Sequence, residues 1–132
     1  MKKPNYKLCI LSAGKGTRNR SIKGLHKSLL PIENKSAISH IIEKFHEETE
    51  IVIAIGYKAE QVKSYIQTIF PKRKISFVFV ENFEGKGSGP GFSLLKCKDL
   101  LQCPFIFTSS DTIIEEKEKL STLEENWIGT SY

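Results

Sequence analysis

The stretch YKLCILSAGKGTR, residues 6–18, joins a run of apolar residues to a loop with two glycines and two basic side chains. The apolar run Tyr6–Ser12 predicts a strand that is buried on both faces, because polar and apolar residues do not alternate along it. Gly14 and Gly16 lack the Cβ atoms that would keep an anion away from the backbone N–H groups. Successive N–H groups in such a loop form a concave anion site. The stretch therefore predicts a strand that ends in an anion-binding loop.

Strand and helix patterns alternate along the rest of the chain. The expected strands are residues 50–56, 74–80, 104–110 and a fifth that begins at 127, and the expected helices are residues 37–48, 59–70, 91–101 and 115–126. Such alternation favours an α/β fold in which a parallel-rich sheet carries helices on both faces, giving three layers.

The length and composition fit one soluble domain. The chain has 132 residues and a formal net charge of +5, which permits an anionic ligand without requiring one. Cys9, Cys97 and Cys103 lack the spacing of a zinc or redox motif, so we expect reduced, buried thiols. No apolar run has the length of a membrane span, and the first one ends at Gly14, too early for a signal peptide. We expect a cytoplasmic protein that binds no membrane.

Basic residues are concentrated in the loop after the first strand. Lys15, Arg18, Arg20 and Lys23 follow within a few residues of the glycines. An arginine can grip two phosphate oxygens at once, so a polyanion such as a nucleoside triphosphate fits this loop. A glycine turn with solvated lysines is the structural alternative.

The spacing of the glycines excludes two common phosphate-binding motifs. A P-loop needs a glycine five residues before a Gly-Lys pair, but Cys9 and Val80 occupy those positions. A dinucleotide fingerprint needs a small residue where Asn19 stands. Ligands of open parallel sheets bind beyond the carboxyl ends of the strands, where the loops at residues 81–90 and 109–112 are also expected.

Four motifs, in order, resemble the nucleotidylyltransferases that make nucleotide sugars. LSAGKGTR at residues 11–18 resembles the family's loop, in which Leu-Ala-Gly-Gly or Leu-Ala-Ala-Gly precedes x-Gly-Thr-Arg. HKSLLPI at residues 26–32 resembles the pattern Pro-Lys-x-Leu-Leu-Pro-Val. GYKAEQV at residues 56–62 resembles the second strand-to-helix junction, and Ser110-Asp111 resembles a strand that ends in Gly-Asp.

The resemblance implies a sheet of strand order 3-2-1-4 and a nucleotidyl transfer. A nucleoside monophosphate would pass from a nucleoside triphosphate to a phosphorylated acceptor, either a sugar phosphate or a small alcohol such as phosphocholine, with release of pyrophosphate. Nucleotide-sugar biosynthesis is the implied setting.

The resemblance also implies roles for individual residues. Arg18 and Lys27 are the implied catalytic residues, with Arg18 on the departing pyrophosphate and Lys27 on the phosphate where charge builds. Asp111 is implied to bind Mg²⁺, the expected cofactor, with an Asx turn or a helix N-cap as its structural alternative. The implied nucleotide-binding residues are Leu11, Ser12, Ala13, Gly14, Lys15, Gly16, Thr17, Arg18, Gly87, Ser88 and Asp111.

The chain departs from the family pattern at several positions. Ser12, His26 and Ser110 stand where alanine or glycine, proline, and glycine are usual. Residues 87–91 stand where Gly-Thr-Ala is common, which leaves the choice of base open. Family domains continue past residue 132, so residues 1–132 are expected to be the N-terminal nucleotide-binding part of a longer fold or a naturally short relative. A truncated sheet would expose an edge that invites self-association into a homo-oligomer.

Two other classes of function stay open at this point. One is a nucleotide-binding module without catalytic activity. The other is a nucleic-acid binder, which is disfavoured because the basic residues are not interleaved with aromatic ones. Structural or surface roles are expected for the three histidines, since His40 and His46 lie on a predicted helix and His26, near the loop, has no evident cysteine or aspartate partner.

Overall fold

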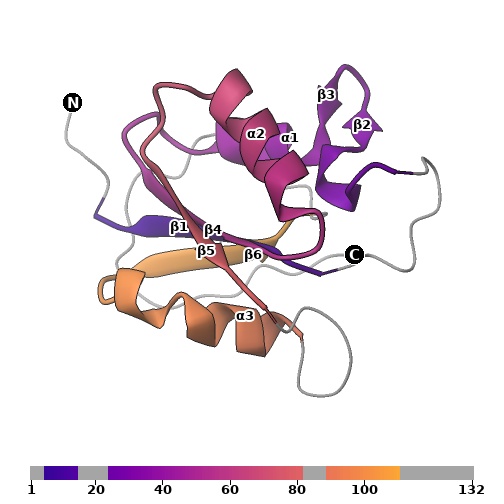
Figure 1. Cartoon of the computed structure of the whole chain (residues 1–132). Coiled ribbons are helices and arrows are strands. Elements are labelled where there is room, and N and C mark those ends of the chain that lie inside the picture. The colour runs from indigo at the N-terminus through magenta and orange to yellow at the C-terminus, as the bar shows by residue number, and fades with distance from the viewer. Residues whose placement is uncertain (1–4, 15–23, 82–88, 111–132) are drawn as a thin grey trace, which may run out of the picture.

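The main sheet has four parallel strands. A computed structural model describes residues 5–14, 24–81 and 89–110 (Figure 1). The strands are β1 (Lys7–Ser12), β4 (Glu50–Ile55), β5 (Ile75–Phe79) and β6 (Phe105–Ser109). They lie in the order β5-β4-β1-β6, and each neighbouring pair is parallel. Counted along the chain this is the order 3-2-1-4, so the predicted fold class and strand order are confirmed.

Helices cover both faces of this sheet. Helices α1 (Ala37–Lys44) and α2 (Ala59–Ile69) lie on one face, and α3 (Pro90–Lys96) lies on the other (Figure 1). Successive residues of β1 point alternately to the two faces: Leu8 and Ile10 belong to the core beneath α1 and α2, while Cys9 belongs to the core against α3. This double burial explains why the strand is apolar throughout.

Helix α1 is shorter than the sequence predicts. The expected helix ran over residues 37–48, but α1 ends at Lys44 and the backbone of Phe45 is extended, with φ −103° and ψ 154°. Phe45 is fully buried, and its ring packs edge-on against Tyr6 with the centroids 6.3 Å apart. The tertiary contact of Phe45 therefore outweighs the helical spacing of its sequence.

The third helix is also interrupted. The prediction of one helix over residues 91–101 was wrong, because α3 ends at Lys96 and a short 3₁₀ turn, η2 (Lys98–Leu100), follows. Cys97 is buried in the core that contains Cys9, and its N–H donates to the carbonyl of Leu94 at 3.0 Å. This bond spans three residues, which tightens the last turn and ends the α-helix.

Three short elements between β1 and α1 were not predicted. They are the 3₁₀ turn η1 (Lys27–Leu29) and a small antiparallel hairpin of β2 (Pro31–Ile32) and β3 (Lys35–Ser36). They are too short to leave a periodic pattern in the sequence. The expected helix at 115–126 and the strand from 127 lie outside the described residues.

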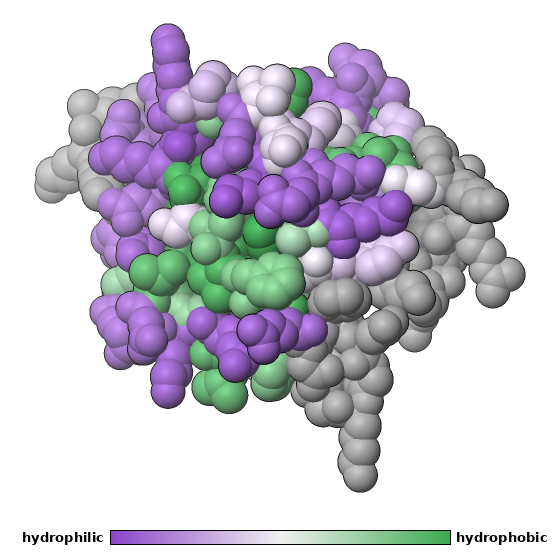
Figure 2. Space-filling view, in the orientation of Figure 1, coloured by the Kyte–Doolittle hydropathy of each residue, from purple (hydrophilic) through white to green (hydrophobic). Residues whose placement is uncertain are grey.

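The cysteines differ in part from the prediction. Cys9 and Cys97 are buried free thiols, but Cys103 is exposed, so the prediction of three buried thiols was wrong for that residue. Figure 2 shows apolar residues gathered in the middle of the visible face, over β5 and below the polar surface of α2. Within the described ranges, no helix could span a bilayer, and α2 has only eleven residues.

Replacing the residue that caps α1 should destabilise the protein. The Ser36 hydroxyl accepts the N–H of Ser39 at 3.2 Å, so Ser36→Ala should lower the free energy of unfolding by about 1 kcal/mol. Urea denaturation measures this change. Ser64→Ala, on the exposed side of α2, is the matched control and should change stability by less than about 0.5 kcal/mol. Equal losses in the two variants would contradict the capping role.

Candidate functional site

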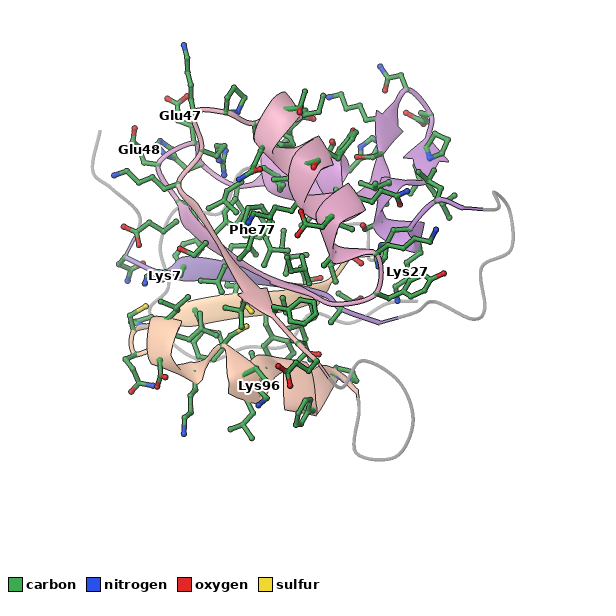
Figure 3. The ribbon with its side chains drawn as sticks, viewed as in Figure 1. Lys7, Lys27, Glu47, Glu48, Phe77 and Lys96 are labelled. Atoms are coloured by element: carbon green, nitrogen blue, oxygen red, sulfur yellow. The ribbon has the colours of Figure 1, made fainter. Side chains whose placement is uncertain are left out.

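Three described segments meet beyond the carboxyl ends of the central strands. They are residues 13–14 after β1, residues 24–30, and residues 56–61, which lead from β4 into α2. The N–H of Tyr57 donates to the carbonyl of Ala13 at 2.9 Å, which joins the first and third segments. Figure 3 shows Lys27 at this edge, across the molecule from Lys7 at the start of β1. We call Gly14, His26, Lys27, Lys58 and Gln61 the carboxyl-edge site.

Lys27 lies over the backbone of Gly14. A Cβ atom placed on Gly14 would be 3.8 Å from Lys27 Nζ, so the ammonium group sits just outside the space that a side chain there would take. Lys27 is the first residue of η1 and is partly exposed. Two motifs that are separate in the sequence are thus brought together in space. The catalytic role of Lys27 stays a prediction.

His26 connects the Lys27 turn to the loop after β1. Its ring is buried, Nδ1 accepts the N–H of Ser28 at 3.1 Å, and Nε2 lies 3.2 Å from the carbonyl oxygen of Gly14. An amide N–H can only donate and a carbonyl can only accept, so the ring is neutral and carries its proton on Nε2. Of the two roles expected for His26, structural or surface, the structure shows the structural one.

The environment of His26 keeps the ring neutral. Burial, and to a smaller extent the positive charges of Lys27 and Lys58, lowers the pKa of His26 from 6.5 to about 4. The hydrogen bond to the Gly14 carbonyl opposes this shift, because it favours a protonated nitrogen. The ring is therefore uncharged at neutral pH, although two lysines lie beside it.

Two residues of the β4–α2 segment hold the turn from the other side. The N–H of His26 donates to Gln61 Oε1 at 2.7 Å, and Gln61 Nε2 donates to the carbonyl of Gly24 at 2.9 Å. Lys58 Nζ donates to the same carbonyl at 2.9 Å. The sequence motif at residues 56–62 carried no assigned role, so Lys58 and Gln61 were missed as site residues. Only their resemblance to a family junction could have singled them out.

The first predicted nucleotide-binding residues are buried. Leu11, Ser12 and Ala13 are at most 8% exposed, so their side chains are not open to a ligand in this structure. The hydroxyls of Ser12 and Ser110 are buried and have no hydrogen-bond partner among the described residues. Leu11 pairs with Ser109 across the two strands, so the two serines follow at the same level of the sheet. Both stand where the family pattern has smaller residues.

The other predicted site residues lie outside the described part of the chain. These residues are Lys15, Gly16, Thr17, Arg18, Gly87, Ser88 and Asp111. Among the residues that are described, no group of three or more histidine, cysteine, aspartate or glutamate side chains could hold a metal ion.

A family model covers most of the chain. The family described as "Domain of unknown function (DUF6564)" matches residues 25–125. This chain belongs to the DUF6564 family. The matched region includes Lys27, Ser110 and the helices α1, α2 and α3, and it begins after Ser12.

Known proteins place this DUF6564 chain among the nucleotidyltransferase folds. It is 34% identical over 109 residues to the bifunctional protein GlmU of Methanococcus maripaludis, covering 81% of this chain and 25% of that protein. A structure named provisionally as a glucose-1-phosphate thymidylyltransferase, from Bacillus anthracis, matches with TM-score 0.69 and 24% identity, over 84% of this chain and 46% of that one. The CTP:phosphocholine cytidylyltransferase LicC of Streptococcus pneumoniae matches with TM-score 0.63 and 22% identity, over 85% and 47%.

These similarities confirm the predicted resemblance to nucleotidylyltransferases and the fold. The DUF6564 chain spans about a quarter of the length of the GlmU protein and about half of each solved structure. The similarities therefore establish the fold and not the activity of the whole protein.

The neutral state of His26 should make stability depend on pH. The unfolded chain takes up a proton as the pH falls below about 6.5, whereas the folded chain does so only near pH 4. Between these values the unfolded state binds more protons, so stability should fall with decreasing pH, by up to about 3 kcal/mol in total. Urea denaturation at several pH values from about 7 to about 4 measures the slope.

Two variants identify the source of this slope. His26→Asn has no group that titrates at position 26, so it should lose this contribution to the pH dependence of stability. His40→Asn should keep it. His40 is the matched control because its Nε2 also meets a backbone carbonyl, that of Ile32 at 2.7 Å. The same slope in wild type and His26→Asn would show that His26 is not held neutral.

Proposed function

We propose that this chain is the nucleotide-binding part of a magnesium-dependent nucleotidyltransferase. The enzyme would move a nucleoside monophosphate from a nucleoside triphosphate to a phosphorylated small molecule, a sugar phosphate or a phosphocholine-like compound, and release pyrophosphate. The observation that carries this proposal is the position of Lys27 Nζ over Gly14 at the carboxyl end of β1. The solved nucleotidyltransferase structures that share the fold support it.

The place of Lys27 in the sheet supports a phosphate-binding role. The chain passes from β1 to β4 on one side and later returns to β6 on the other side of β1. Strand order reverses there, and the loops that leave the strands in opposite directions form a crevice in folds of this class. A lysine ammonium at such a crevice offers a compact positive charge to phosphate oxygens.

The proposed reaction needs positioning and charge rather than a covalent nucleophile. A phosphate oxygen of the acceptor attacks the α-phosphorus in line, the bond to the bridging oxygen breaks, and pyrophosphate leaves. Lys27 would stabilise the negative charge that builds on the α-phosphate oxygens. Arg18 would bind the departing pyrophosphate through two parallel hydrogen bonds.

Magnesium fits the proposed donor set. Mg²⁺ keeps several waters and takes one or two protein carboxylates together with phosphate oxygens. Asp111 follows Ser110 in the sequence, and the N–H of Ser110 donates to the carbonyl of Leu11 at 3.2 Å, which places the end of β6 beside β1. Asp111 would hold the ion, which would neutralise phosphate charge.

Removing the Lys27 ammonium should reduce turnover without unfolding the protein. In the longer natural protein, Lys27→Ala should lower kcat/KM by about 30-fold to 1,000-fold, or about 2–4 kcal/mol of transition-state stabilisation. A pyrophosphate-release assay measures this. Lys96→Ala is the matched control, because Lys96 is an exposed lysine at the end of α3 on the other face of the sheet (Figure 3). Turnover within about twofold of wild type in Lys27→Ala would remove Lys27 from the mechanism.

Triphosphate binding by the 132-residue chain should depend on magnesium. Calorimetric titration should show weak binding with Mg²⁺ and weaker binding with a chelator, while turnover is negligible because the chain spans only part of its relatives. Asp111→Asn should abolish the magnesium dependence, and Asp99→Asn, on the exposed turn η2, should leave it unchanged. Equal affinity with Mg²⁺ and with chelator in the wild type would make Asp111 a turn or cap residue.

The same titrations separate the proposed function from nucleic-acid binding. A triphosphate should bind more tightly than a single-stranded oligonucleotide at the same salt concentration. An oligonucleotide that binds more tightly, with a steep loss of affinity as salt rises, would favour the alternative instead.

A further inference from the structure

We infer that His26 is a positioning residue, which holds the Lys27 turn against Gly14 so that the Lys27 ammonium stays in place for the phosphates of the ligand. The inference rests on the proposed function for the identity of that ligand. It concerns a histidine that stands where the nucleotidylyltransferase pattern has proline.

The His26 ring makes a hydrogen bond to Gly14 that the turn itself does not need. Within the turn, the N–H of Leu29 donates to the His26 carbonyl at 2.9 Å and the N–H of Leu30 donates to the Lys27 carbonyl at 3.2 Å. These bonds, with the Nδ1 cap on Ser28, close η1 locally. The bond between Nε2 and the Gly14 carbonyl adds nothing within the turn. It links the turn to a segment twelve residues earlier in the chain.

This link is buried and held from several sides. His26 is 1% exposed, so water does not compete for its hydrogen bonds. The Tyr57 ring lies beside it with the centroids 6.1 Å apart, and Gln61 binds its backbone N–H. A side chain fixed in this way has one orientation, and it transmits that orientation to the residue that follows it, Lys27.

Lys27 has a long, flexible side chain, which is why positioning its backbone matters. A lysine side chain has four rotatable bonds, and ordering it on binding loses conformational entropy. Fixing the backbone of Lys27 against Gly14 restricts where its ammonium can reach before a ligand arrives. Because the ring is neutral, it provides this tether without adding a third positive charge beside Lys27 and Lys58.

Two amide substitutions separate the tether from the cap. His26→Asn places an amide oxygen where Nδ1 lies, so it keeps an acceptor for Ser28 but is too short to reach Gly14. His26→Gln places an amide nitrogen near the position of Nε2, so it can donate to the Gly14 carbonyl. His40→Asn is the control for removing a ring that meets a carbonyl elsewhere.

The test measures binding of inorganic triphosphate with Mg²⁺ to the 132-residue chain by calorimetry. This probe has no base or sugar, so it reports the phosphate site alone. His26→Asn should bind about fivefold to tenfold more weakly than wild type, the effect of losing one ordering hydrogen bond. His26→Gln and His40→Asn should stay within about twofold.

A double-mutant cycle shows whether the effect passes through Lys27. In a Lys27→Ala background, His26→Asn should weaken binding no further, because the group that it positions is absent. A purely structural role would weaken binding equally in both backgrounds. An equal effect would therefore overturn the inference, as would wild-type affinity in His26→Asn. Urea denaturation of each variant confirms that folded proteins are compared.

The ring of the wild type gives a test that needs no variant. ¹⁵N spectra of the imidazole should show the proton on Nε2 at neutral pH, and a proton on Nδ1 would overturn the inference even where His26→Asn fails to fold. If the wild type binds neither inorganic triphosphate nor any nucleoside triphosphate, the proposed function fails and the positioning role fails with it. If the wild type binds but His26→Asn binds equally well, only the role of His26 fails.

Discussion

The carboxyl-edge site depends on the confinement of β1. This strand is bonded to β4 on one side and to β6 on the other along nearly its whole length, and its side chains are buried on both faces. The end of β1 is therefore held in place, and so is the Gly14 carbonyl two residues beyond it. Two hydrogen bonds attach the other segments of the site to this end: the N–H of Tyr57 donates to the carbonyl of Ala13, and the His26 ring binds the carbonyl of Gly14.

The polar groups of the site are unevenly satisfied. His26 uses both ring nitrogens and its backbone N–H, and Gln61 uses both ends of its amide. Within residues 5–14, 24–81 and 89–110, the buried hydroxyls of Ser12 and Ser110 have no partner, and a buried group left unpaired costs about 1–3 kcal/mol. Proteins accept such losses mainly where another requirement outweighs them. Packing alone therefore does not explain why serine stands at these two positions at the ends of β1 and β6.

Enzymes with different acceptors share this fold, so the fold alone does not identify the acceptor. The solved structures named above act, by their names, on glucose 1-phosphate and on phosphocholine, and both match this chain to a similar extent. A sheet of this order supplies the crevice, whereas the groups that line it select the base and the acceptor. Lys27 and the backbone of Gly14, for which we propose phosphate binding, would act on any phosphorylated acceptor and so do not distinguish one acceptor from another.

The sequence by itself determined the layered fold, because buried parallel strands and amphipathic helices leave local patterns that periodicity reveals. The strand order followed from the resemblance to the nucleotidylyltransferases. The sequence also marked Gly14 and Lys27 through motifs of fixed spacing. Only the tertiary structure decided where α1 and α3 end, because the burial of Phe45 and Cys97 overrides their helical spacing. Only the tertiary structure joined His26 to Gly14 and Gln61, since these bonds connect residues 12 and 35 positions apart in the chain. Local sequence patterns carry no information about such contacts, because the partners meet only after the sheet has formed.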